Sequence, residues 1–259
     1  MEEFKIFILG LVQGLTEFLP VSSSGHIEVF KYFFNLKFIK NQGLLLTLVL
    51  HFATALSTIW VFRKEILSIF LNKDFKRNRF FLNIIISMIP AVLVGLFLEE
   101  FIGLLFNSNI ILVGIMLILT SILLFKTDKV NPKSKNISLK NAFIIGLIQA
   151  IAILPGISRS GATIASASML GVKKSEATKF SFLMVIPLIF GSMFKSILFY
   201  PKDESLNFSP ILLIGFISAF LTGILACKLM IKIVEKSQLK YFGYYCLIFG
   251  LFLASYGAI

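Results

Sequence analysis

A polar stretch at residues 10–26 interrupts strongly apolar sequence and reads GLVQGLTEFLPVSSSGH. Gln13 and Glu17 lie four residues apart, so a helix would place both side chains on one face. Pro20 ends that helix, and the serines at 22–24, followed by glycine, favour a turn with a helix N-cap. A carboxylate beside hydroxyl groups can move protons, activate a nucleophile or hold a cation. Because polar groups at membrane depth are costly, the stretch is interpreted as a functional site.

A second stretch at residues 146–162, GLIQAIAILPGISRSGA, repeats this design with a shift of 136 positions. The identities pair Gly10, Leu11, Gln13, Ser22, Ser24 and Gly25 with Gly146, Leu147, Gln149, Ser158, Ser160 and Gly161. The chemically important differences are Glu17 against Ile153, Ser23 against Arg159 and His26 against Ala162. The first copy therefore keeps an acid, an extra hydroxyl and an imidazole. The second copy supplies a guanidinium, whose planar fork suits phosphate oxygens.

Together the two motifs resemble those of the bacterial undecaprenyl-diphosphatase family, the bacitracin-resistance type of lipid pyrophosphatase. That family's first motif has an acid or glutamine, a glutamate four residues on, and then P-V-S-S-x-G-H. Its second motif is P-G-x-S-R-S-G, and both motifs occur here in order. The apolar layout is similar to the family's across nearly the whole chain. One departure is Gln13, where many members carry glutamate, so a metal site here would hold one carboxylate rather than two.

The resemblance implies hydrolysis of undecaprenyl pyrophosphate to undecaprenyl phosphate and inorganic phosphate. This reaction recycles the lipid carrier for peptidoglycan and other cell-wall polymers and confers resistance to bacitracin. The expected catalytic residues are Glu17, Ser23, His26 and Arg159, with the choice between Ser23 and His26 as nucleophile left open. The expected phosphate-binding residues are Ser22, Ser24, Gly25, Ser158, Ser160 and Gly161. A divalent cation, Mg²⁺ or Ca²⁺, would be held by Glu17 and the substrate phosphates, with the side-chain carbonyl of Gln13 contributing.

Other interpretations of these residues stay open. Gln13 and Gln149 could hydrogen-bond between helices, and the serines could cap helices or support close packing. His51 lies alone on an apolar span and is interpreted as structural. Glu17 and Arg159 could pair only for stability, although buried charges are costly unless they are used.

A lipid-phosphate flippase is the rival function, because transporters share inverted repeats, broken helices and a binding site at the membrane midplane. The cluster of glutamate, serine and histidine favours an enzyme, since binding phosphate alone does not require it. Phosphate release in detergent discriminates between the two functions, because transport cannot register there. The expected partners are the polyprenyl pyrophosphate lipid and the membrane, and a homodimer stays open.

The composition is that of an integral membrane protein. The chain has 259 residues, of which 57% are hydrophobic and only 15% charged, with 29 phenylalanines. A soluble domain of this size could not bury so much apolar surface. The net charge of +12 does not indicate nucleic-acid binding, because the lysines lie in short loops between apolar spans. Cys227 and Cys246 fall in such spans and are predicted to be ordinary core residues. The acidic start, MEEFK, is unlike a cleaved signal peptide.

The apolar segments predict an all-α polytopic membrane protein with six transmembrane helices and two re-entrant hairpins. The hairpins are predicted at residues 4–30 and 141–172, because their helices are too short to cross a bilayer. The spans are predicted at 43–62, 80–98, 109–125, 180–199, 209–229 and 241–257. They form one domain, 1–259, built of two inverted repeats at about 4–125 and 141–257.

The loops predict the orientation in a bacterial cytoplasmic membrane. Most of the 25 lysines and arginines lie in loops at 63–79, 126–140, 173–179 and 228–240. The positive-inside rule places these loops in the cytoplasm, which leaves both termini outside. The first hairpin then opens to the outside and the second to the inside, with their tips meeting near the midplane. Lys31, Lys37 and Lys40 would lie outside, where they could attract an anionic head group.

Overall fold

The computed structural model describes residues 2–34, 37–71, 75–105, 109–132, 134, 136–198, 209–236 and 238–257. These residues form helices and connecting turns, with one isolated bridge between Ser134 and Val172. The helices are α1 Glu2–Phe18, α2 Ser23–Phe34, α3 Lys37–Val61, α4 Arg63–Leu71, α5 Phe75–Phe97, α6 Glu99–Leu105, α7 Ile110–Asp128, α8 Leu139–Ile151, α9 Arg159–Met169, α10 Lys174–Leu198, α11 Pro210–Glu235 and α12 Lys240–Tyr256. The prediction of an all-helical protein is therefore confirmed.

Four helices in the described part of the chain are long and apolar enough to cross a membrane. They are Arg79–Phe97 within α5, then α7, α10 and α11. The spans predicted at 43–62 and 241–257 are also helical, as α3 and α12. Helix α12 is 17 residues long, and the apolar part of α3 that is described is Leu45–Val61. The structure thus supports a multi-pass membrane protein, with four spans defined by length and composition.

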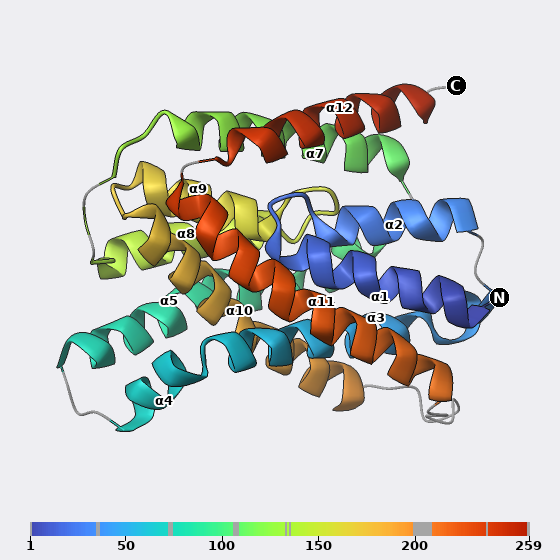
Figure 1. The fold of residues 1–259 in the computed structure, drawn as a ribbon, viewed down its shortest axis with the longest axis horizontal. Coiled ribbons are helices and arrows are strands. Elements are labelled where there is room, and N and C mark those ends of the chain that lie inside the picture. Colours follow the sequence, from blue (N-terminus) through green and yellow to red (C-terminus); the bar gives the residue numbers. More distant parts are fainter. Residues whose placement is uncertain are drawn as a thin grey trace.

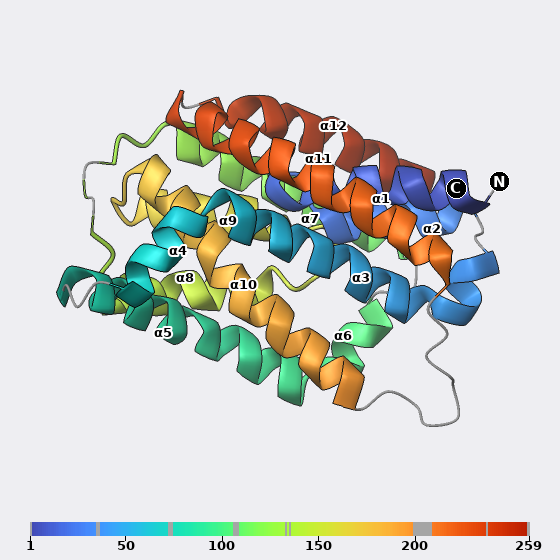
Figure 2. The same cartoon turned by 60° about the horizontal axis from the view of Figure 1, so that its bottom comes forward.

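The two short hairpins enter the bundle from opposite ends and meet in its middle (Figure 1). Helices α1 and α2 reach inward from the end that holds the N-terminus, whereas α8 and α9 reach inward from the other end. At that other end α3, α7, α9 and α11 finish and α5, α8, α10 and α12 begin, which Figure 2 shows from a second side. Both termini therefore lie at one end of the bundle, opposite the connections that carry most of the basic residues.

Each hairpin packs against a long helix of the opposite half of the chain. Helix α1 lies along α11, and α8 lies along α5. Glycines allow these close approaches. A Cβ at Gly10 would lie 2.6 Å from the carbonyl oxygen of Gly215, and one at Gly146 would lie 2.4 Å from that of Ser87. Small residues at such crossings are typical of membrane helix packing, where shape rather than hydrophobicity drives association.

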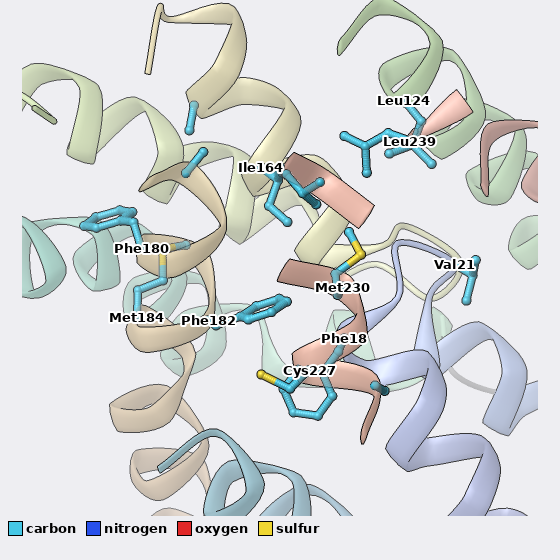
Figure 3. Close-up of a cluster of buried hydrophobic side chains, with 14 of the residues drawn as sticks. Phe18, Val21, Leu124, Ile164, Phe180, Phe182, Met184, Cys227, Met230 and Leu239 are labelled. Carbon is cyan, nitrogen blue, oxygen red and sulfur yellow. The ribbon is translucent and has the colours of Figure 1, made fainter. Parts of the chain in front are cut away.

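Apolar side chains hold the first hairpin tip against the centre of the bundle (Figure 3). Phe18, the last residue of α1, packs edge to face on Phe182 of α10, with ring centroids 5.4 Å apart. Cys227 and Met230 of α11 belong to the same buried cluster. Both cysteines are free and buried, which confirms that they are core residues. The packing fixes the end of α1, and therefore the position of Glu17 just before it.

Candidate active site

The tips of the two hairpins touch each other. The Oγ of Ser160 donates a hydrogen bond of 3.3 Å to the carbonyl oxygen of Leu19. A Cβ at Gly25 would lie 3.1 Å from the Cα of Gly156, and one at Gly161 would lie 3.0 Å from the Cβ of Pro20. Glycine suits both contacts, because a Cβ at either position would be closer to the opposite tip than most van der Waals contacts. The predicted meeting of the two motifs is confirmed.

Matching serines cap the inner helices at both tips. Ser22 Oγ accepts from the backbone N–H of Gly25 at 3.2 Å, and Ser158 Oγ accepts from that of Gly161 at 3.1 Å. The capping role of these two serines is thus observed, and phosphate binding by the motif serines stays a prediction. The capped N-terminal ends of α2 and α9 still carry partial positive charge, which favours a nearby anion.

The first tip holds its backbone in a rarely populated conformation. Ser22 has φ of +69°, in the left-handed region that disfavours side chains, whereas its counterpart Ser158 has φ of −74°. The second tip uses a glycine for its left-handed residue, Gly156, with φ of +96°. A non-glycine residue in this region costs about 1–3 kcal/mol and is typical of functional sites. The first tip is therefore held by its surroundings rather than by local preference.

Glu17 is the centre of a polar network between the tips. Its side chain is 6% exposed, and Arg159 Nη2 donates to Oε1 in a largely buried ion pair. The other oxygen, Oε2, accepts from Ser23 Oγ at 2.7 Å and from Gln13 Nε2 at 3.1 Å. The carboxylate thus joins residues from both repeats. Ser23 Oγ is within the range in which a carboxylate can remove the proton of an attacking hydroxyl.

A cavity of about 450 Å³ lies against this network. Its walls come from both tips and from α3, α5 and α10, and many polar side chains contribute, although the surface that faces the cavity is mostly apolar. The polar lining residues are Thr16, Glu17, Ser22, Ser23, Ser24, Glu28, Lys31, Thr47, His51, Gln149, Ser158, Arg159, Ser160 and Ser192. An apolar enclosure with convergent polar groups is the usual form of a small-molecule site. Its lining along α2 runs from Ser23 to Lys31, toward the end of the bundle that holds the termini.

His26 is the one predicted catalytic residue that does not line the cavity. Its Nδ1 lies 2.8 Å from the carbonyl oxygen of Ser22, and its Nε2 lies 2.6 Å from the hydroxyl of Tyr245 on α12. The ring also stacks on Tyr245 and Phe249. The structure therefore places the His26 imidazole against α12, apart from Glu17, Ser23 and Arg159.

His51 lines the cavity instead, although it was expected to be structural. Its Nδ1 lies 2.8 Å from the carbonyl oxygen of Thr47 and must donate, so a neutral ring keeps the lone pair on Nε2. Glu28, which is 2% exposed, also lines the cavity and pairs with Lys31 at 2.8 Å. For both His51 and Glu28, the sequence feature that could have indicated a place at the site is a polar residue within apolar sequence. Lys37 and Lys40 have side chains outside the described residues.

The oxygen atoms of Glu17 and Gln13 suit a divalent cation only if a bound ligand supplies further oxygens. No group of three or more histidine, cysteine, aspartate or glutamate side chains in the described residues could hold a metal. Gln13 donates from Nε2 to Glu17, and its Oε1 is buried and accepts no hydrogen bond from the residues that the structure describes. Mg²⁺ needs only one or two carboxylates when substrate phosphates and water supply the remaining oxygens. In such a site, the oxygen ligands from the protein would be those of Glu17 and Gln13.

These features define a multi-pass membrane protein. Its apolar spans surround two helical hairpins, and a buried polar site lies where the hairpins meet. The chain belongs to the family described as bacitracin resistance protein BacA, whose model matches residues 6–252. The predicted family is therefore confirmed over nearly the whole sequence.

Relatives match the chain from end to end. A protein of Christiangramia forsetii named undecaprenyl-diphosphatase is 52% identical over 97% of each chain. Proteins with the same name from Bacteroides fragilis and Methanococcus vannielii are 47% and 43% identical. The first of these covers 97% of both chains, and the second covers 96% of this chain and 98% of the relative.

Proposed function

We propose that this cavity is where the chain hydrolyses undecaprenyl pyrophosphate to undecaprenyl phosphate and inorganic phosphate. The chain is a membrane phosphatase: the BacA family model matches it over residues 6–252, and its relatives carry the name undecaprenyl-diphosphatase. Family membership also links it to bacitracin resistance and to recycling of the lipid carrier for cell-wall synthesis. One observation carries the assignment of the site: Ser23 Oγ lies 2.7 Å from Glu17, whose other oxygen pairs with Arg159.

Ser23 is the nucleophile in this proposal. Glu17 Oε2 takes the hydroxyl proton as Ser23 Oγ attacks the terminal phosphorus. The new Oγ–P bond replaces the bond to the bridging oxygen, and undecaprenyl phosphate leaves. Water then attacks the phosphoserine, which releases inorganic phosphate and returns the proton to Ser23. His26 has a supporting role in this proposal, because its Nδ1 already bonds the carbonyl oxygen of Ser22 and its Nε2 the hydroxyl of Tyr245 on α12.

Arg159 stabilises the transferred phosphoryl group. Its Nη2 pairs with Glu17, and its Nη1 is buried without a hydrogen-bond partner in the described structure. A planar guanidinium that keeps donors unused is suited to two phosphate oxygens at once. The N-terminal ends of α2 and α9 add positive potential at the same place. As the substrate phosphate competes for Arg159, Glu17 becomes freer to accept the proton of Ser23.

A divalent cation, Mg²⁺ or Ca²⁺, is part of the proposal. Glu17 and the unused Oε1 of Gln13 would hold it together with the diphosphate. When bound, such an ion would neutralise negative charge on the phosphates. With the ion present, Arg159 still binds the phosphate and Glu17 still removes the proton of Ser23.

Purified wild-type protein in detergent should release inorganic phosphate from undecaprenyl pyrophosphate, because hydrolysis does not need a membrane. A flippase that uses the same phosphate site would release none. The same assay can detect the proposed intermediate, as a phosphate attached to the peptide that contains Ser23 after rapid acid quenching. Wild-type protein that binds the lipid without releasing phosphate would contradict the proposed function.

The packing supports six spans, two re-entrant hairpins and two inverted repeats. With the shift of 136, α8 corresponds to α1 and α11 to α5, and the packing of α1 on α11 is mirrored by that of α8 on α5. The opposite entry of the hairpins agrees with an inverted topology. In this arrangement the basic connections face the cytoplasm, and the cavity lining leads from the hairpin tips toward the outside.

The expected orientation can be checked by cysteine labelling in intact cells, after Cys227 and Cys246 are replaced by serine. Glu99→Cys should react with a membrane-impermeant reagent, because α6 follows the span that ends on the external side. Lys140→Cys should react only after the cells are opened, because the basic connection before α8 faces the cytoplasm. The opposite pattern at both positions would contradict the proposed orientation.

A further inference from the structure

Gln149 has a buried side-chain amide and lines the cavity, and no described residue hydrogen-bonds that amide. It lies on α8 shortly before the second hairpin tip, its side chain is 1% exposed, and it lines the cavity. Neither Nε2 nor Oε1 has a hydrogen-bond partner in the described part of the chain. Buried amides are almost always paired, because an unpaired polar group loses its bonds to water. A position that keeps both atoms unpaired next to a cavity points to a ligand.

The comparison with the first hairpin explains why the amide is unpaired. Gln13, the counterpart of Gln149, donates from Nε2 to Glu17 one turn further along α1. In the second hairpin the residue at the position of Glu17 is Ile153, which offers no acceptor. Gln13 therefore orients Glu17 in the first repeat, whereas Gln149 in the second repeat has no partner on its own helix.

The neighbouring groups identify the chemistry of the ligand. Arg159 Nη1 is a second buried donor without a partner, and Arg159 and Gln149 line the same cavity. Gln149 Nε2 and the cationic Arg159 Nη1 are both N–H donors, so the ligand that suits them is an anion with several acceptor oxygens. The capped helix ends at Ser22 and Ser158 favour the same charge. A diphosphate meets all of these conditions.

We propose that Gln149 is a substrate-binding residue whose Nε2 donates to a non-bridging oxygen of the diphosphate beside Arg159 Nη1. This inference rests on the proposed function and adds a residue that the family motifs do not include. Gln149 supplies a neutral donor, so it fixes the orientation of the phosphate without adding charge. Inorganic phosphate, the product, offers the same acceptors and serves as a probe that requires no turnover.

Gln149→Leu tests the proposal because leucine has a similar size and no polar atoms. The variant should raise KM for undecaprenyl pyrophosphate and the inhibition constant of inorganic phosphate by about tenfold or more, as expected for losing a hydrogen bond to a charged group. The Tm of the ligand-free variant should equal or exceed that of the wild type, because an unpaired buried amide has been removed. Gln149→Glu should bind phosphate more weakly still, since its carboxylate repels the anion.

Ser168→Ala is the matched control. Ser168 lies on α9, and its Oγ is also buried without a hydrogen-bond partner in the described ranges, but it does not line the cavity. This variant should keep the wild-type KM and phosphate inhibition. Unchanged KM and inhibition in Gln149→Leu, with an active wild type, would overturn the role of Gln149. A markedly lower Tm in the ligand-free Leu variant would assign a structural role and also overturn it. A wild type that releases no phosphate would overturn the proposed function instead.

Discussion

Arg159→Lys should lower kcat by roughly 10²–10³, even though it keeps the positive charge. In the structure Arg159 lines the cavity and reaches Glu17 with Nη2, while its buried Nη1 has no hydrogen-bond partner among the described residues. A lysine ammonium is a single point charge and cannot hold the acid and two phosphate oxygens in one plane. The loss should appear mainly in kcat, because the contact tightens as charge develops on the transferred phosphoryl group.

Steady-state kinetics on the purified variant measures this effect. Ser166→Ala is a suitable control, because Ser166 lies on the same helix and its Oγ donates back to the carbonyl oxygen of Thr163 without lining the cavity. The control should retain wild-type kcat and KM. A lysine variant within a few-fold of wild type would make Arg159 a structural counter-charge and would remove the main support for the active site.

Glu17→Gln should abolish most activity, because the amide cannot accept the proton of Ser23. The carboxylate oxygen that accepts from Ser23 at 2.7 Å would be replaced by a neutral group. The substitution also leaves Arg159 buried without its acid, and removing one partner of a buried ion pair typically costs about 3–5 kcal/mol. We therefore expect folded protein with a lower Tm and little phosphate release.

The double variant Glu17→Gln with Arg159→Gln separates the two roles. Removing both charges should restore much of the lost Tm, since a neutral pair avoids an unpaired buried charge. Activity should stay as low as in the single variant. If Glu17→Gln alone keeps near-wild-type turnover, the pair serves stability only, and Ser23 needs another base.

The breaks in the helices and the equivalence of the two motifs could be predicted from the sequence because they depend on local chemistry. Pro20 and Pro155 cannot continue a helix, and the serines beside them favour caps, so both hairpins were expected where the structure has them. Apolar runs likewise predicted the long helices. The repeat also predicted that Glu17 and Arg159 share one pocket, because equivalent tips of opposite entry meet near the middle, whereas their ion pair was only one of the interpretations left open.

Only the tertiary structure decided which way each polar side chain faces. His26 and His51 both lie on helices, yet the His26 ring contacts Tyr245 of α12 and does not line the cavity, whereas His51 does. Gln13 and Gln149 occupy equivalent positions, yet one is paired and the other is not. Sequence spacing fixes positions along a helix, whereas the rotation of that helix depends on the neighbours against which it packs. For that reason the sequence by itself determined the motifs and their meeting point, and the fold decided which of their atoms are left for a ligand.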